Sequence, residues 1–344
     1  MSLSPQENFA EGRLRILAGS PREVELNPEP DSADQGGMAP PGHARPFVKW
    51  AGGKTQLLGQ IGGLIPARIR GRYFEPFLGS GAVFLHLWST GRIEGGAVLS
   101  DASRPLVDTW LAIQRDADEV IRVLTAHRDA HHRDARGHFY SVRDSEPDSS
   151  AERAARFIYL NKTCFNGLWR VNRKGRFNVP MGSYVKPTIF EPENLRLVSK
   201  ALSSAEIACH GFEVALNRMG RDDVAYLDPP YQPLSTTSSF TAYTAEGFGD
   251  AEQVRLADAC ARIRSRGAYF VLSNHDTPRL ERLYRSRRFR FASIQARRSI
   301  NCDPNARAGV SELLVVDGRR GARTCRMSIA SLTSLSTDPA GAPK

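Results

Sequence analysis

The sequence predicts an α/β fold with an open, mostly parallel sheet, interrupted by a mainly helical insert. Apolar runs of strand length alternate with helical patterns, and the last three of four runs end in a polar or charged group. Between residues 106 and 195 the alternation stops, giving way to an amphipathic helical pattern and then to a loop dense in Asn, Gly, Arg and aromatic residues. In an open parallel sheet, ligands bind beyond the carboxyl ends of the strands.

The strands follow from these runs in order along the chain. The first, 73–77, precedes a glycine-rich loop and a helical pattern that opens at Ala82. The next three runs, 97–101, 224–228 and 268–274, end in Asp101, Asp228 and Asn274. A late pair of apolar runs, near 289–294 and 312–316, predicts a hairpin at the edge of the sheet.

Composition divides the chain into five segments. The first 44 residues are rich in Pro, Gly and Ser, hold seven Asp or Glu against three Arg, and show no sustained apolar period. Such a segment is expected to be flexible, and the end of the chain is similar. The expected segments are a flexible N-terminal extension at 1–44, the first half of the α/β core at 45–105, the helical insert at 106–195, the second half of the core at 196–320, and a flexible C-terminal tail at 321–344.

Charge points to a polyanionic partner. The 344 residues carry a formal net charge of +10 and are rich in arginine. Arginine forks suit phosphates and guanine edges, so nucleic acid is the favoured partner, with a merely solvated basic surface as the alternative. The five cysteines are scattered without a Cys-x-x-Cys pair, which predicts no disulfide framework and no metal site. No membrane span or secretory signal is evident, so we expect a cytoplasmic protein.

The loop after the first strand fits a nucleoside cofactor. Gly79 and Gly81 let the backbone approach a ligand closely, although an ordinary tight turn has the same pattern. Phe84 stands where a dinucleotide fingerprint has its third glycine, which argues against a pyrophosphate. Asp101, about twenty residues further on, can accept hydrogen bonds from ribose hydroxyls, or simply cap the next helix.

A second glycine-containing stretch, 49–55, is not a phosphate-binding loop. That loop would need a glycine five residues before Gly53, where Val48 stands. Trp50 and Lys54 can instead present an apolar face and a cation to a zwitterionic amino-acid group. Trp50 is as well suited to a place in the core.

The stretch Asp228-Pro229-Pro230-Tyr231 carries the most chemical information. Two prolines after a buried strand stiffen the backbone and remove N–H donors, which leaves only acceptors. An exocyclic amino group donates two hydrogen bonds, so the Asp228 carboxylate and a proline carbonyl can hold both of its protons. Tyr231 offers a ring for stacking a planar base, and a base in a duplex must first be flipped out. The alternative is a capping turn with a buried tyrosine.

The insert contains a stretch, 161–180, in which amide and guanidinium groups alternate with aromatic residues. Arginine and asparagine read base edges, Lys and Arg neutralise phosphate, and an aromatic ring can wedge into a base stack. A merely solvated loop has little use for Phe165, Leu168 and Trp169, of which Trp169 is best suited to the core.

In their order along the chain, from about Pro46 to Val316, these motifs resemble the Dam-type, alpha-class, site-specific DNA adenine-N6 methyltransferases. The matching blocks are 47–54, 75–81, 159–162 through 178–180, Asp228-Pro229-Pro230-Tyr231, Ser273-Asn274-His275-Asp276 and Arg298-Ser299-Ile300. The resemblance implies a Rossmann-like S-adenosylmethionine-dependent core with the target-recognition domain inserted between a cofactor half and a catalytic half. It implies that the protein binds double-stranded DNA as a monomer or weak dimer. It also implies a cytoplasmic, nucleoid-associated protein that serves restriction-modification or orphan methylation.

The resemblance also assigns roles to single residues. It implies catalytic roles for Asp228, Pro229 and Tyr231. The implied cofactor contacts are Trp50, Lys54, Phe77, Gly79, Gly81, Asp101 and Asp228. The implied DNA contacts are Lys49, Phe165, Asn166, Leu168, Arg170, Pro180 and Tyr184.

Within the recognition block, the chain departs from well-known Dam enzymes at two positions. Phe165 replaces the usual tyrosine, and Ser183 stands where a basic residue is frequent. Retention of Leu168 and Arg170, suited to a thymine methyl and a guanine edge, keeps GATC as the leading target. The alternatives are a methyltransferase for RNA or another planar amine, and a DNA-binding protein on an inactive methyltransferase scaffold.

Overall fold

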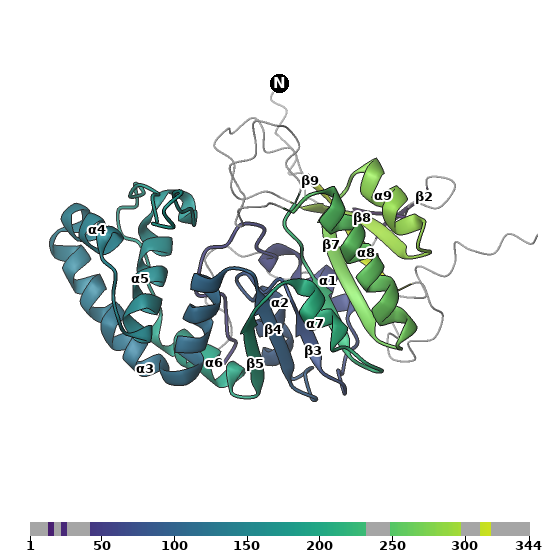
Figure 1. The fold of residues 1–344 in the computed structure, drawn as a ribbon, viewed down its shortest axis with the longest axis horizontal. Coiled ribbons are helices and arrows are strands. Elements are labelled where there is room, and N and C mark those ends of the chain that lie inside the picture. The colour runs from purple at the N-terminus through teal and green to yellow at the C-terminus, as the bar shows by residue number, and fades with distance from the viewer. Residues whose placement is uncertain (1–12, 17–21, 26–41, 232–247, 297–309, 318–344) are drawn as a thin grey trace, which may run out of the picture.

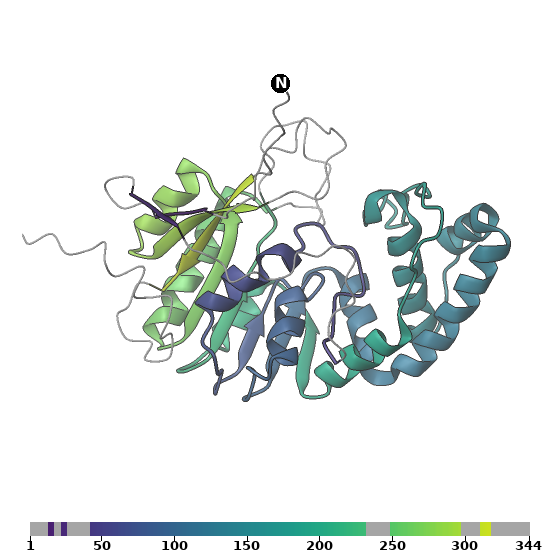
Figure 2. The same ribbon diagram turned by 180° about the vertical axis from the view of Figure 1, so that it is seen from behind.

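The computed structural model describes residues 13–16, 22–25, 42–231, 248–296 and 310–317, and shows a twisted sheet with a helical lobe to one side (Figures 1 and 2). Its strand order is β2-β1-β8-β9-β7-β6-β3-β4-β5. The strands are β1 (Arg13–Ile16), β2 (Arg22–Glu25), β3 (Tyr73–Glu75), β4 (Ala97–Asp101), β5 (Ala205–Cys209), β6 (Val224–Leu227), β7 (Tyr269–His275), β8 (Arg290–Ala296) and β9 (Val310–Val316).

The predicted α/β class is confirmed. Strands β7, β6, β3, β4 and β5 are parallel neighbours, and β9 and β8 follow as an antiparallel pair. The four predicted strands and the late antiparallel pair are therefore present, but the pair is not at the edge of the sheet, because β1 and β2 lie beyond β8. The sequence missed β5, and it missed the short β1 and β2 within the segment expected to be an extension, where β1 pairs antiparallel with β8. The expected tail at 321–344 and the block 298–300 lie outside the described residues.

Helices cover both faces of the sheet (Figures 1 and 2). One face carries α1 (Leu58–Leu64), which follows the short 3-10 helix η1 (Thr55–Leu57), and α2 (Ala82–Ser89); the other carries α7 (Phe212–Asn217), α8 (Asp250–Ser265) and α9 (Pro278–Arg285). Successive side chains of a strand point to opposite faces. Accordingly Tyr73 belongs to one buried cluster and Phe74 to the other.

The insert forms the separate lobe in Figure 1. It contains α3 (Arg104–Arg133), α4 (Ala135–Asp144), α5 (Ser150–Thr163) and the 3-10 turn η2 (Phe165–Gly167). Helix α6 (Pro192–Leu202) then leads back to β5. Helix α3 is broken at Asp116, whose φ and ψ are −158° and 86° and whose carboxylate accepts the N–H of Glu119 at 3.0 Å. Ser149 and Glu152 form a capping box at the start of α5, which fixes where that helix begins.

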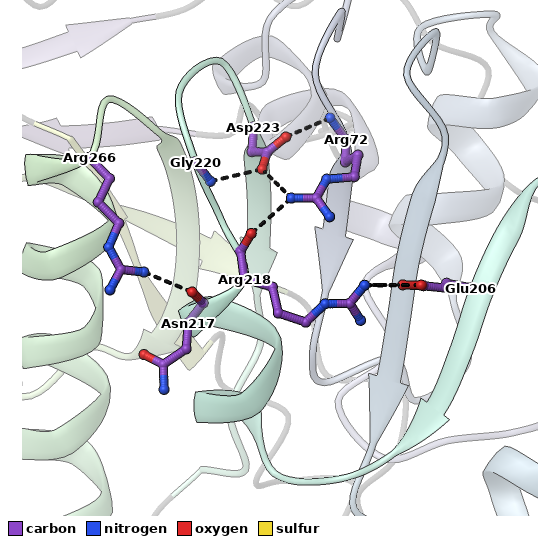
Figure 3. Close-up of polar contacts among 7 residues, drawn as sticks. All are labelled: Arg72, Glu206, Asn217, Arg218, Gly220, Asp223 and Arg266. Atoms are coloured by element: carbon purple, nitrogen blue, oxygen red, sulfur yellow. Dashed lines mark hydrogen bonds and ion pairs between the residues drawn. The ribbon is translucent and has the colours of Figure 1, made fainter.

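Arginine–carboxylate contacts tie the strands together at the amino edge of the sheet (Figure 3). The buried Asp223 carboxylate accepts the N–H groups of Arg72 at 2.8 Å and Gly220 at 2.9 Å, and pairs with the Arg72 guanidinium at 3.0 Å. Arg218 pairs with Glu206 on β5 at 2.5 Å. These contacts connect β3, β5 and β6 at the edge opposite the polar residues that the sequence singled out.

Candidate functional site

Strand β3 lies at the point where the chain reverses its direction of travel across the sheet. It pairs in parallel with β4 on one side and with β6 on the other. Open α/β sheets bind ligands at this switch point, beyond the carboxyl ends of the strands. Asp101 ends β4 and Asp228 follows β6, so the structure places both predicted carboxylates on either side of the loop that leaves β3.

The loop after β3 brings Trp50, Gly79 and Asp101 together. The Gly79 N–H donates to Asp101 Oδ2 at 2.9 Å, and the Ser103 N–H donates to Asp101 Oδ1 at 2.9 Å. Burial raises the pKa of Asp101, while these backbone N–H groups lower it. Gly79 has a φ of +49°, and a Cβ there would lie 2.8 Å from the Trp50 ring. Glycine is therefore required for this approach.

Gly81, which was also predicted to contact a cofactor, faces the core. A Cβ at Gly81 would lie 2.7 Å from Trp110, a fully buried ring, and the φ of Gly81 is +66°. Trp110 in turn donates its Nε1–H to the Gly79 carbonyl at 3.2 Å. Because Gly81 has no side chain, Trp110 can pack against the loop and hydrogen-bond to Gly79.

Lys54 and Asp228 form a buried ion pair. Lys54 Nζ lies 2.9 Å from Asp228 Oδ2 and 3.9 Å from Glu312 Oε1, and it donates to the Gly52 carbonyl at 2.7 Å. The lysine is 3% exposed, whereas the Asp228 side chain is 19% exposed. Burial raises the pKa of Asp228 and Lys54 lowers it. The charge of Lys54 faces Asp228, and its contact with a zwitterionic ligand stays a prediction.

The Tyr231 ring packs beside this ion pair. Its ring centroid lies 4.4 Å from that of His275 at the end of β7, and Lys54 Nζ lies 4.9 Å from the Tyr231 ring. Pro229 is buried and Pro230 is exposed. Because neither proline has an N–H, the polar groups that this turn offers next to Asp228 are carbonyl oxygens.

Two carboxyl groups at this edge had no role in the sequence-based assignment. Glu75, 3% exposed at the end of β3, accepts the Tyr73 hydroxyl at 2.6 Å. Burial raises the pKa of Glu75 to about 8; the Tyr73 hydrogen bond lowers it and the charge of Asp228 raises it. Glu312 comes from β9 and is 8% exposed. The available signal was an acidic residue within an apolar strand, which is rarely buried without a partner.

Phe77 lies in an aromatic cluster next to the loop. Its ring centroid is 5.5 Å from Phe212, at the start of α7, and 5.7 Å from Phe248, just before α8. Phe77 itself is half-buried. The cluster places an apolar group on the loop that leaves β3, suitable for a flat, partly apolar ligand.

The predicted DNA contacts gather around one turn, 165–168, which follows α5 and is called here the recognition turn. Phe165 and Leu168 are 45% and 37% exposed, and Asn166 adopts a left-handed backbone with φ +53°. The Phe165 N–H donates to the Pro180 carbonyl at 2.9 Å, which holds Pro180 against the turn.

Further predicted contacts lie beside the recognition turn. Lys49 Nζ lies 3.9 Å from the centroid of the Tyr184 ring. Arg170 is exposed and donates its Nε–H to Asn178 Oδ1 at 2.8 Å. Trp169 has a supporting role, since its ring packs between Phe157 at 3.9 Å and Phe177 at 4.7 Å. Phe165 and Leu168 are thus exposed apolar side chains on a turn that lies next to a half-buried tryptophan.

Two other kinds of feature are absent from the described residues. No group of His, Cys, Asp or Glu side chains among them is arranged to hold a metal ion. No helix within the described ranges is long and apolar enough to cross a membrane.

Comparison with known proteins identifies one family. Residues 50–300 match the model of the D12 class N6 adenine-specific DNA methyltransferases. The chain is 38% identical over 288 residues to the type II methyltransferase M.MjaIII of Methanocaldococcus jannaschii, covering 79% of this chain and 99% of that protein. It is 37% identical over 281 residues to the type II methyltransferase M1.LlaDCHI of Lactococcus lactis subsp. cremoris, covering 79% and 95%. A DNA adenine methylase of Haemophilus influenzae is 35% identical over 279 residues, covering 80% and 94%.

Proposed function

The chain belongs to the D12 class N6 adenine-specific DNA methyltransferases, and from this premise we propose that it methylates an adenine flipped out of a short duplex sequence, with S-adenosylmethionine as methyl donor and GATC as leading target. Adenine-specific DNA methylation itself follows from the family. The donor, the base flipping and the target sequence are the proposal.

The residues around Gly79 fit S-adenosylmethionine. Both Asp101 oxygens accept a backbone N–H, and each keeps a further lone pair for a ribose hydroxyl. Trp50 and Phe77 supply flat apolar surface nearby. The loop has no third glycine for a pyrophosphate, which agrees with a cofactor without phosphates. When bound, this cofactor supplies an electrophilic methyl group on a sulfonium.

The single observation that carries the proposal is the acceptor-only turn at Asp228. The carboxylate is held by Lys54, and the following Pro229 contributes a carbonyl without an N–H. We infer that the adenine amino group donates one N–H to each of these acceptors, which turns its lone pair toward the methyl group. Tyr231 stacks on the base. No covalent enzyme intermediate is needed, because positioning and electrostatics supply the rate enhancement.

Recognition of the duplex is assigned to the turn 165–168 and to Arg170. Phe165 is the exposed ring suited to wedging into the base stack, while Leu168 suits a thymine methyl group. Arg170 donates its Nε–H to Asn178, which leaves the two terminal nitrogens of the Arg170 guanidinium for the O6 and N7 of guanine. These contacts support GATC as the leading target.

The direct test is methyl transfer by the purified protein to unmethylated duplex DNA. We expect transfer that depends on S-adenosylmethionine, N6-methyladenine as the modified base after digestion, and one short sequence by methylation-aware sequencing. Modified cytosine, or equal methylation of duplex DNA and structured RNA, would overturn the proposal. Methylated adenine outside GATC would overturn only the target.

The role of Arg170 is tested against a neighbouring arginine. We expect Arg170→Ala to weaken discrimination against a changed guanine by roughly 1 to 3 kcal/mol, with a smaller effect on turnover at the preferred site. Arg173, exposed on the same loop, is the matched control, and Arg173→Ala should weaken binding to all sequences alike. Equal loss of discrimination in the two variants would remove Arg170 from base reading.

A further inference from the structure

Asn161, on α5, connects two segments that lie far apart in the sequence. Its Oδ1 accepts the Lys49 N–H at 2.7 Å, and its Nδ2 donates both to the Lys49 carbonyl at 2.8 Å and to the Gly167 carbonyl at 2.9 Å. The side chain is completely buried. One amide thus holds the backbone of the segment 47–50, here called the donor segment because it contains Trp50, and the backbone of the recognition turn.

Asn194, on α6, provides a natural comparison. Its Oδ1 accepts the Arg45 N–H at 2.9 Å and its Nδ2 donates to the Arg45 carbonyl at 3.0 Å. It is 7% exposed. The two asparagines therefore make the same two-point contact with the backbone of one stretch of chain, at Arg45 and at Lys49, which are four residues apart. Only Asn161 makes the third bond, and that bond goes to the recognition turn.

Side-chain packing beside Asn161 also connects the donor segment with the recognition turn. A Cβ at Gly167 would lie 2.6 Å from the Lys49 side chain, so the turn and the donor segment are in close contact. The Trp50 ring lies 6.2 Å from Phe157, which lies 3.9 Å from Trp169 beyond the turn. The route from Gly79 through Trp50 to the recognition turn is continuous and buried or half-buried.

We propose that Asn161 is a positioning residue that couples the recognition turn to the donor segment, so that DNA binding and methyl-donor binding strengthen each other. This inference rests on the proposed function. A shift of the turn must carry Lys49 and Trp50 with it or leave the Asn161 amide unpaired in a buried site, which is unfavourable. Because such coupling is reciprocal, it is measurable from either ligand.

The test measures the affinity of S-adenosylhomocysteine, a non-reactive probe, with and without the duplex identified by methylation mapping. For the unmodified protein we expect the duplex to tighten binding at least about fivefold, the lower end of typical coupling. Asn161→Ala should reduce this factor to below about twofold. Asn194→Ala, which removes the matched contact, should leave it unchanged. Equal coupling in all three proteins, or none in the unmodified one, overturns the proposal.

A second measurement avoids any variant that folds poorly. In the unmodified protein, S-adenosylhomocysteine alone, without DNA, should slow hydrogen exchange of the Gly167 and Leu168 amides more than that of the Gly175 amide, on the same loop but remote from Asn161. These three amides donate to Cys164, Phe165 and Asn172 carbonyls. No difference in exchange overturns the coupling. Failure of the proposed function is a separate outcome, because it appears as absent adenine methylation.

Discussion

The two edges of the sheet both carry carboxylates, but the partners of these carboxylates differ in their exposure to solvent. At the amino edge, carboxylates are matched by arginines that reach solvent: Arg72 is 39% exposed beside Asp223, and Arg218 is 41% exposed beside Glu206 (Figure 3). At the carboxyl edge, Glu75 and Glu312 are buried and Asp101 and Asp228 are half-buried. The amine that faces Asp228 is the buried Lys54.

This difference distinguishes charged groups that hold the strands in place from charged groups that are suited to chemistry. The arginine ends of these pairs lie near water, where the charge attraction itself contributes little, and the pairs mainly hold their elements in register. Carboxyl groups in a desolvated site resist ionisation, and the pKa values of Glu75, Asp101 and Asp228 are raised chiefly by burial. Clusters of this kind mark functional sites, and here the cluster coincides with the switch point of the sheet.

The largest predicted effect lies at the carboxyl edge. Asp228→Ala removes the acceptor that we propose for the adenine amino group and leaves Lys54 without its closest carboxylate. We expect kcat for methyl transfer to fall roughly 100- to 1,000-fold, as when a preorganised hydrogen-bonding group is removed from an active site. Duplex binding should persist, because the recognition turn is untouched. Single-turnover transfer and DNA titration measure the two quantities, and full activity would sink the assignment.

The next prediction concerns pH. Between its ordinary pKa of 4.5 and about 8, Glu75 keeps its proton in the folded protein and loses it in the unfolded chain. The folded state then binds more protons, so the free energy of unfolding falls as pH rises through this window. Glu75→Gln should reduce that slope by roughly 1 kcal/mol per pH unit. An unchanged slope in Glu75→Gln would contradict the prediction.

A change at the amino edge should act on stability and leave catalysis alone. Asp223→Ala removes the acceptor of the Arg72 and Gly220 N–H groups. We expect a loss of about 1 to 3 kcal/mol in the free energy of unfolding, the usual cost of leaving buried donors unpaired. Denaturant titration measures this, and kcat per folded molecule should be unchanged. A fall in kcat comparable to that of Asp228→Ala would erase the distinction between the edges.

The sequence predicted the core strands because each buried parallel strand has a signal in its own residues, a short apolar run that ends in a polar group. It missed β5, whose run Ala205-Glu206-Ile207-Ala208-Cys209 is interrupted by a charge, and β1 and β2, which lie in a segment of polar composition. Their pairing depends on partners remote in the chain, which local composition does not reveal.

The sequence also predicted some residues of the site and missed the contacts between others. Trp50, Gly79 and Asp101 were singled out and do lie together. The partner of Lys54 could not be found from spacing, because Asp228 stands far along the chain and only the sheet brings the two together. The roles of Asn161 and Gly81 depend on such long-range contacts as well.

The smallest predicted effects distinguish the two glycines of the loop. Both have positive φ, so alanine at either position should cost about 1 to 2 kcal/mol of stability. In Gly79→Ala the new methyl group meets Trp50, and we expect KM for the methyl donor to rise roughly threefold to tenfold, which corresponds to about 1 kcal/mol. In Gly81→Ala it meets Trp110 in the core, so stability should fall with a smaller change in KM. Equal KM values would show that Trp50 does not contact the donor, and would shift the cofactor assignment toward Asp101 and Phe77.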